Sequence, residues 1–268
     1  MNTAHSCFIC RQPAKTREHV IPRWLQRRFS LWNQELLLPN RSSIRYRQLA
    51  IPSCLRCNSH VFAPLEQRVE SGTATDSDLW KWANKIHYGL GYKDRLLAWD
   101  RENPDQRIAD LVRSEDPIQR DRLFLHCVSG AVLTEPDPFG SVFRFKFNSP
   151  QPFRFAHFLS SKSICVCFGS TGLICFVTDG QALKRDSAIT HELGRLPSSL
   201  NVNDMVFLYA KLVEHFTRHN LHQTIIVAEG LVMRVGRTVA RDVQPPNKDR
   251  FRAICKCLGL ELVETSET

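Results

Sequence analysis

Three short stretches decide the fold: Cys7-Phe8-Ile9-Cys10, Arg17-Glu18-His19-Val20-Ile21-Pro22 and Cys54-Leu55-Arg56-Cys57-Asn58. A Cys-x-x-Cys turn directs both of its sulfur atoms at one ion, and zinc sites commonly take two ligands from each of two such turns. The 43 residues between Cys10 and Cys54 are more than a compact zinc ribbon requires, so the chain must leave the metal, build a separate structure and return. We predict one structural zinc ion with four thiolate ligands, Cys7, Cys10, Cys54 and Cys57. The alternative is four buried free thiols.

The N-terminus and the hydropathy pattern predict a cytoplasmic protein. Met1-Asn2-Thr3-Ala4-His5 lacks the charged segment and apolar run of a secretory signal. No apolar run approaches the roughly 20 residues of a membrane span. We therefore expect the ten cysteines to be mostly reduced, and paired thiols in a reducing compartment are better metal ligands than disulfides.

The positive charge of the chain is unevenly distributed. The formal net charge is +9, and residues 1–72 contain ten Arg and one Lys against four Glu, a net charge of +7. A basic field on one module favours a polyanion such as nucleic acid, because neutralising phosphates releases counterions. The alternative is an arginine-rich surface that is merely solvated.

Length and composition allow more than one domain. A chain of 268 residues with 43% hydrophobic content can form one large or two ordinary domains, each with a buried core. We predict an α+β fold in three parts: a zinc-binding module over 1–72, a helical connecting region over 73–129 and an α+β domain over 130–268. The last part would recognise a substrate or a partner.

Apolar periodicity places the regular elements. Helical spacing predicts helices over 75–91, 108–126 and 203–216. Strands are predicted from alternating or apolar runs over 142–147, 153–159, 224–227 and 231–235. The segment Gly169-Ser170-Thr171-Gly172 predicts the turn of a β-hairpin between strands 163–168 and 173–178.

Other cysteines and histidines leave two interpretations open. The cysteines of the C-terminal part are either buried in strands or form a second metal site; they are Cys165, Cys167, Cys175, Cys255 and Cys257. Three histidines near the end of a predicted helix are suited to its negative dipole end; they are His215, His219 and His222.

The N-terminal motifs resemble those of HNH endonucleases of the ββα-metal fold, in their zinc-stapled variety. The shared elements are the first cysteine pair, Glu18 to Pro22 with Trp24-Leu25, the second pair with Asn58, and Leu65-Glu66. The segments Trp80 to Ile86 and Gly91 to Asp94 are also similar to these proteins. The resemblance covers about the first 95 residues.

The resemblance implies a metal-dependent endonuclease that hydrolyses phosphodiester bonds, in DNA more than in RNA, with a role in defence against foreign DNA. It implies that His19 is the general base that takes a proton from the attacking water. Glu18 and Asn58 would bind a catalytic ion, and these hard oxygen ligands favour Mg²⁺ or Mn²⁺. Zinc would hold the fold, and the second ion would stabilise charge on the phosphate.

This chain departs from the family pattern at several positions. The family has an Asn about five residues before the second cysteine pair, where this chain has Tyr46-Arg47-Gln48-Leu49-Ala50, and Gln48 is the available substitute. Glu18 replaces the commoner Asp. His60 rivals Asn58 as a ligand, but side chains two residues apart on a helix point about 200° apart. We prefer Asn58.

Four arginines are the candidate phosphate contacts: Arg23, Arg27, Arg28 and Arg56. Two other functions stay open. The missing Asn favours both of them over an endonuclease. One is a non-catalytic zinc module for nucleic-acid binding or assembly. The other is an adaptor that binds a protein partner through the C-terminal domain. We expect no membrane partner.

Overall fold

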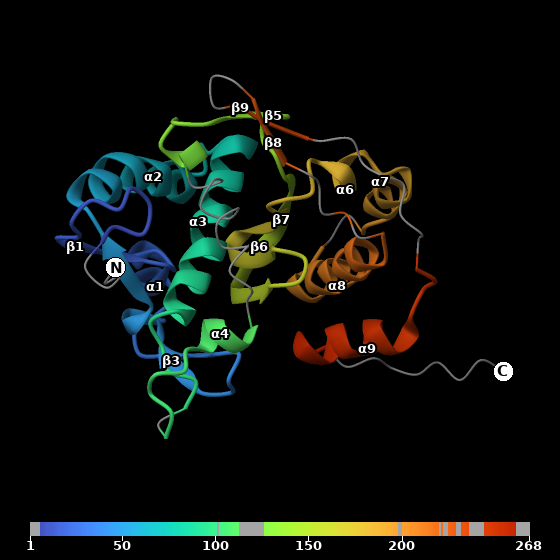
Figure 1. Ribbon diagram of the computed structural model, residues 1–268. Coiled ribbons are helices and arrows are strands. Elements are labelled where there is room, and N and C mark those ends of the chain that lie inside the picture. The colour runs from blue at the N-terminus through green and yellow to red at the C-terminus, as the bar shows by residue number, and fades with distance from the viewer. Residues whose placement is uncertain are drawn as a thin grey trace. The chain divides into compact units, whose positions relative to one another are not determined.

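The protein divides into two compact units, which are described separately here. A computed structural model describes residues 6–100, 102–112, 126–197, 200–219, 221, 225–228, 232–235 and 244–260 (Figure 1). The first unit comprises Met1–Thr134 with Ala228–Val232, and the second comprises Glu135–Val227 with Met233–Thr268. Helices and strands are mixed, which confirms the predicted α+β class. None of the described helices is both long enough and apolar enough to cross a membrane.

The first unit builds two small antiparallel sheets and a set of helices. Its elements in chain order are β1 (Thr16–His19), α1 (Arg23–Arg28), β2 (Glu35–Leu37), β3 (Ser43–Arg45), η2 (Tyr46–Gln48), β4 (Ala50–Ser53), η3 (Arg56–Phe62), α2 (Ala63–Ser71), α3 (Asp76–Asp94) and α4 (Ile108–Val112). Strand β1 pairs with β4, with His19 opposite Ala50, and β2 pairs with β3. The predicted helix over 75–91 is confirmed as α3.

Helix α3 belongs to the same unit as the cysteine-rich module, because it packs against β4 and α2. The core between them is aromatic: the Phe8 ring stacks on Phe62 and Tyr88, with centroids 5.6 Å and 6.0 Å away. Gly89 allows the helix to approach closely, since a Cβ atom there would lie 3.0 Å from Val20 Cγ2. The segment 73–129 therefore contributes to the first unit, where the sequence suggested a connecting region.

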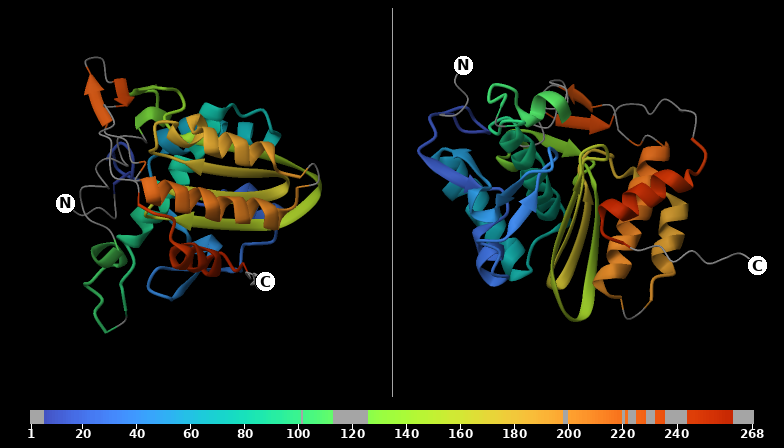
Figure 2. Two further views of the ribbon diagram at one scale, coloured as in Figure 1. Left: turned by 90° about the vertical axis from the view of Figure 1, so that its right-hand side faces the viewer. Right: turned by 90° about the horizontal axis from the view of Figure 1, so that it is seen from below.

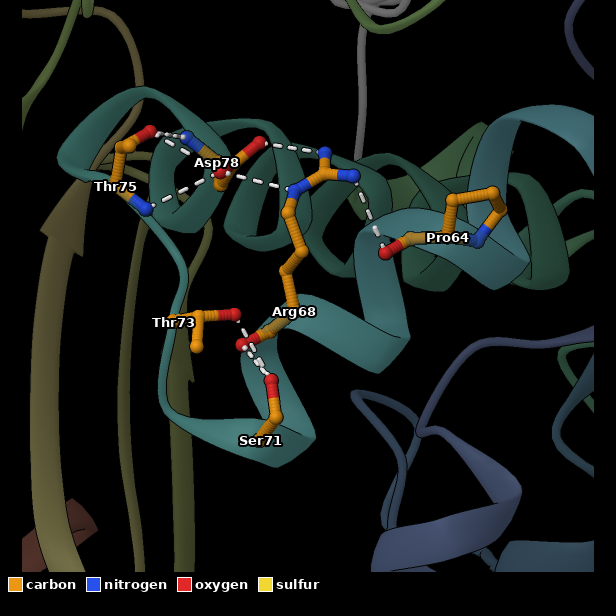
Figure 3. Close-up of polar contacts among 6 residues, drawn as sticks. All are labelled: Pro64, Arg68, Ser71, Thr73, Thr75 and Asp78. Atoms are coloured by element: carbon orange, nitrogen blue, oxygen red, sulfur yellow. Dashed lines mark hydrogen bonds and ion pairs between the residues drawn. The ribbon is translucent and has the colours of Figure 1, made fainter.

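A surface network joins the end of α2 to the start of α3 (Figure 3). The Arg68 guanidinium donates to both carboxylate oxygens of Asp78, at 2.7 Å and 3.1 Å, and to the Pro64 carbonyl oxygen at 3.3 Å. The Asp78 carboxylate also accepts from the backbone N–H and hydroxyl of Thr75, whose hydroxyl in turn accepts from the Asp78 N–H. This reciprocal capping fixes where α3 begins.

We expect the Asp78→Asn substitution to lower the free energy of unfolding by about 1 kcal/mol at pH 7. Burial tends to raise the pKa of Asp78, but hydrogen bonds from Arg68 and Thr75 hold it below its ordinary value of 3.8. Since the folded pKa is depressed, this stabilisation exists above pH 3.8 and is lost as the pH falls through the folded value. Urea unfolding followed by tryptophan fluorescence should show the two proteins converging toward pH 3, and an unchanged difference would contradict this.

The second unit is built on one long antiparallel ribbon, β6 (Ser141–Phe158) paired with β7 (Ser163–Phe176). The predicted hairpin turn at 169–172 is wrong, because these residues lie inside β7 and the chain reverses at 159–162. Gly172 serves close packing instead: a Cβ atom there would clash with Met205 Sδ and lie 2.9 Å from Phe147 Cζ. The predicted strands 142–147 and 153–159 are parts of the single strand β6.

Helices cover the ribbon within the second unit. They are α6 (Ala182–Arg185), α7 (Ser187–Gly194), α8 (Val202–His219) and α9 (Lys248–Cys257). Helix α8, drawn in orange in Figure 2, packs on β6 and β7 and confirms the helix predicted over 203–216.

Strands β5 (Leu133–Glu135), β9 (Val232–Val235) and β8 (Ile225–Ala228) form a sheet in the order β5-β9-β8. Residues 113–125 of the predicted helix over 108–126 lie outside the described residues.

Candidate metal centre and adjoining cleft

The four predicted cysteine ligands converge on one position. The sulfur atoms of Cys7, Cys10, Cys54 and Cys57 all lie within 4.8 Å of one another. The Cys10 and Cys54 sulfurs are 3.6 Å apart. Four thiolates in this arrangement match the donor set of a tetrahedral ion such as Zn²⁺. Within the described part of the chain, no other group of three or more His, Cys, Asp or Glu side chains could hold a metal ion.

Backbone hydrogen bonds hold the two cysteine turns together. The Phe8 N–H donates to the Pro52 carbonyl at 3.1 Å, which docks the first turn on β4, and β4 ends one residue before Cys54. Burial opposes ionisation of the Cys7 thiol, but hydrogen bonds from the backbone at Cys54, Cys10 and Ile9 lower its pKa to about 7. The thiolate is the form that binds a metal, and burial raises the pKa of Cys10 and Cys57, so without an ion Cys7 is more readily ionised than these two thiols.

Strand β1 divides the predicted catalytic residues between its two faces. Successive side chains of a strand point to opposite sides, so Glu18 and His19 face apart. The half-buried Asn58 lies at the start of η3, and its Nδ2 donates to Thr16 Oγ1 at 3.1 Å and to the Arg17 carbonyl at 3.4 Å. Because Thr16 and Glu18 share a face of β1, Asn58 contacts the face opposite His19.

The Glu18 carboxylate is engaged in a buried ion pair. Glu18 is 5% exposed, and its Oε1 contacts the ammonium of Lys85 on α3. The same ammonium contacts Glu66 Oε1 on α2 and donates to the His19 carbonyl at 2.9 Å. Burial raises the pKa of the Glu18 carboxyl to about 7; Lys85 opposes this rise and Glu66 adds to it.

The His19 imidazole lies in a cleft of about 610 Å³. The cleft is lined by Arg17, His19, Trp32, Ile44, Arg47, Gln48, Ala50, Lys93 and Leu97. Among the described residues, the lining includes three cationic side chains and no carboxylate, so a bound anion meets attraction from these side chains. Gln48, the substitute for the missing Asn, lines this cleft, whereas Glu18 and Asn58 do not.

The surroundings of His19 keep its ring neutral. Burial lowers the pKa of His19 to about 4, and the charges of Arg23, Lys85 and Arg17 add to this effect. Its Nδ1 is buried without a hydrogen-bond partner among the described residues, so Nδ1 is not open to a ligand. The ring centroid lies 5.8 Å from that of Trp32. A neutral imidazole can accept a proton.

None of the three cleft cations is among the four candidate phosphate contacts drawn from the sequence. Arg17 and Lys93 both donate to the Ala50 carbonyl at 3.4 Å, one from β1 and one from α3. Burial lowers the pKa of Lys93, and Arg17 adds to this effect. Strand alternation places Arg17 on the face of His19, and that signal was present in the sequence. Nothing in the sequence connects Lys93 to this cleft.

The four predicted phosphate contacts lie on the surface of the first unit. Arg23, Arg27, Arg28 and Arg56 are all exposed, and none of them lines the cleft. The Arg23 guanidinium lies over the Trp32 ring, 5.8 Å from its centroid, which places it beside the cleft.

The remaining cysteine and histidine clusters form no metal group among the described residues. Cys165, Cys167 and Cys175 are buried on one strand, β7, where the sequence suggested two strands. His215 Nε2 lies 3.0 Å from an Asp186 carboxylate oxygen, and the rings of His215 and His219 stack with centroids 4.1 Å apart. His222 lies outside the described residues.

Comparison of the chain with protein-family models, with curated proteins and with solved structures finds no match.

Proposed function

We propose that the first unit is a zinc-stapled, HNH-type endonuclease module of the ββα-metal kind, which hydrolyses phosphodiester bonds in nucleic acid, DNA in preference to RNA. The observation that carries the proposal is a neutral imidazole in a cleft with three cations and no carboxylate. The HNH-like motif supplies the reaction class, and the cleft supplies the matching electrostatics.

The three cations and the imidazole of the cleft have separate roles in this chemistry. Arg17, Arg47 and Lys93 bind the phosphodiester and stabilise the negative charge that develops on its oxygens. His19 Nε2 accepts a proton from the attacking water. A bound phosphate brings negative charge next to the ring, which offsets the surrounding cations and raises the pKa of His19 toward neutrality. The exposed arginines Arg23, Arg27, Arg28 and Arg56 add contacts to flanking phosphates.

The expected Mg²⁺ or Mn²⁺ ion does not fit the residues as they are placed. The Glu18 carboxylate is bound by Lys85 on the face of β1 opposite His19, and Asn58 holds Thr16 on that same face. An ion at Glu18 would have to displace the ammonium. We therefore assign no catalytic step to such an ion, and Glu18 and Asn58 remain predicted ligands.

The test is whether the zinc-loaded full-length protein cleaves nucleic acid. The substrates are supercoiled plasmid, single-stranded DNA and RNA. Each substrate is incubated with Mg²⁺, with Mn²⁺ and without an added divalent ion. We expect strand breaks in DNA. Loss of ion-dependent cleavage in Glu18→Gln and Asn58→Ala would assign them as ligands, whereas cleavage that survives in both would place the chemistry in the cleft alone.

The second candidate is a non-catalytic zinc module for nucleic-acid binding or assembly. The observation that favours it is the ion pair between Glu18 and Lys85, because a carboxylate paired with an ammonium does not bind a catalytic metal ion. This function predicts salt-sensitive binding with no strand breaks under any ion condition, and binding unchanged by His19→Ala. That outcome would overturn the endonuclease proposal.

A further inference from the structure

Lys85 is the most completely buried cation in the described part of the first unit. Its side chain is 0% exposed, and its ammonium contacts the carboxylates of Glu18 and Glu66. It also donates to the His19 carbonyl oxygen at 2.9 Å and lies 5.6 Å from the centroid of the Phe62 ring. One nitrogen thus joins β1, α2 and α3.

These contacts match the hydrogen-bonding capacity of the Lys85 ammonium. A lysine ammonium has three N–H donors, and the three acceptors are two carboxylates and one carbonyl. Two of the three partners are consecutive residues of β1, Glu18 and His19. Lys85 on α3 therefore holds the backbone of β1 by a hydrogen bond to the carbonyl oxygen of His19, the residue that carries the imidazole.

A contribution to folding stability does not by itself explain why a charged lysine is buried at this position. Taking charges out of water costs several kcal/mol per ion, and well-packed apolar residues often replace a buried ion pair without loss. An ammonium with fixed partners does what apolar packing does not, because hydrogen bonds specify direction. The group it directs is the strand segment behind His19, whose ring lies 5.8 Å from Trp32 in the cleft.

We propose that Lys85 is a positioning residue: by binding Glu18, Glu66 and the His19 carbonyl together, it fixes β1 so that the imidazole faces the cleft beside Trp32. This role rests on the proposed function, because a positioned imidazole matters only if His19 acts in the cleft. The position of the ring can nevertheless be measured in the free protein, without any cleavage.

The test is NMR of the zinc-loaded full chain without nucleic acid, at one fixed pH. The ring signals of His19 are identified by their absence in His19→Gln, and the nuclear Overhauser effect between His19 and Trp32 reports the ring position. In Lys85→Met we expect this effect to disappear and the His19 ring shifts to move. Lys81→Met, on the same helix and partly exposed, should leave both unchanged. If the chain cleaves nucleic acid, Lys85→Met should lower the turnover number about 10- to 100-fold with affinity unchanged.

A second variant separates positioning from folding. Lys85→Met leaves the buried Glu18 carboxylate and the partly buried Glu66 carboxylate without their ammonium partner and can unfold the unit, so the neutral triple variant Lys85→Met/Glu18→Gln/Glu66→Gln is measured as well. We expect it to fold and still lose the His19–Trp32 effect. A folded variant with wild-type His19 signals would overturn the proposal, and so would failure of both variants to fold, which would make Lys85 a structural residue. Absence of cleavage with a displaced ring would overturn only the endonuclease function.

Discussion

The Cys54→Ser variant is expected to lose its metal ion and the folded state of the first unit. Structural zinc sites in peptides contribute about 10–16 kcal/mol at pH 7, whereas a whole domain is typically stable by about 5–15 kcal/mol. The first cysteine turn docks on β4, and the second leads into η3, so an ion bound by all four thiolates would tie both ends of the module to one point. Without such an ion, the two cysteine turns that flank β1 lose the link between them.

The measurement combines zinc analysis with tryptophan fluorescence. All five tryptophans lie in the first unit, at positions 24, 32, 80, 82 and 99, so their emission reports this unit alone. We expect one equivalent of zinc in the wild type and none in Cys54→Ser, with red-shifted emission. Cys257→Ser, which removes an exposed thiol of α9, should behave as wild type. Full zinc content and a wild-type melting curve in Cys54→Ser would contradict the assignment.

The sequence was informative where the signal is local. A Cys-x-x-Cys turn places its own sulfurs, so the convergence of four thiols followed from two short motifs. Helices α3 and α8 followed from apolar spacing, although α8 buries one long stripe whereas α3 is buried all round from Trp82 to Asp94. The hairpin prediction at 169–172 failed because Gly172 has two possible meanings, a turn or a close approach. The positions of Met205 on α8 and Phe147 on β6 decide between them.

The candidate site was harder to predict because its partners are distant in sequence. Lys85 lies 67 residues after Glu18, and no local pattern pairs them. The motif suggested that Glu18 faces a metal ion, whereas tertiary packing gives the carboxylate an ammonium. Tertiary packing also brings Lys93 to the cleft, from the last turn of α3. Strand alternation alone shows that Glu18 and His19 face apart.

His19→Ala is expected to abolish most of the cleavage while leaving binding intact. General-base catalysis contributes about 10²–10⁴-fold, and His19 is the one histidine among the described residues that line the cleft, which include no carboxylate. The cations Arg17, Arg47 and Lys93 are unaffected, so the affinity for nucleic acid and its salt dependence should stay near wild type. His60→Ala is the matched control, because His60 is exposed and lies outside the cleft.

The single-turnover cleavage rate of zinc-loaded wild type and His19→Ala, compared at saturating DNA, tests the central claim most directly. Saturation removes differences in affinity, and equal zinc content removes differences in folding. The proposed function predicts a wild-type rate at least about 100-fold above that of the variant, with the His60→Ala rate near wild type. Equal rates in wild type and His19→Ala, or no cleavage by a folded and DNA-bound wild type, would contradict it.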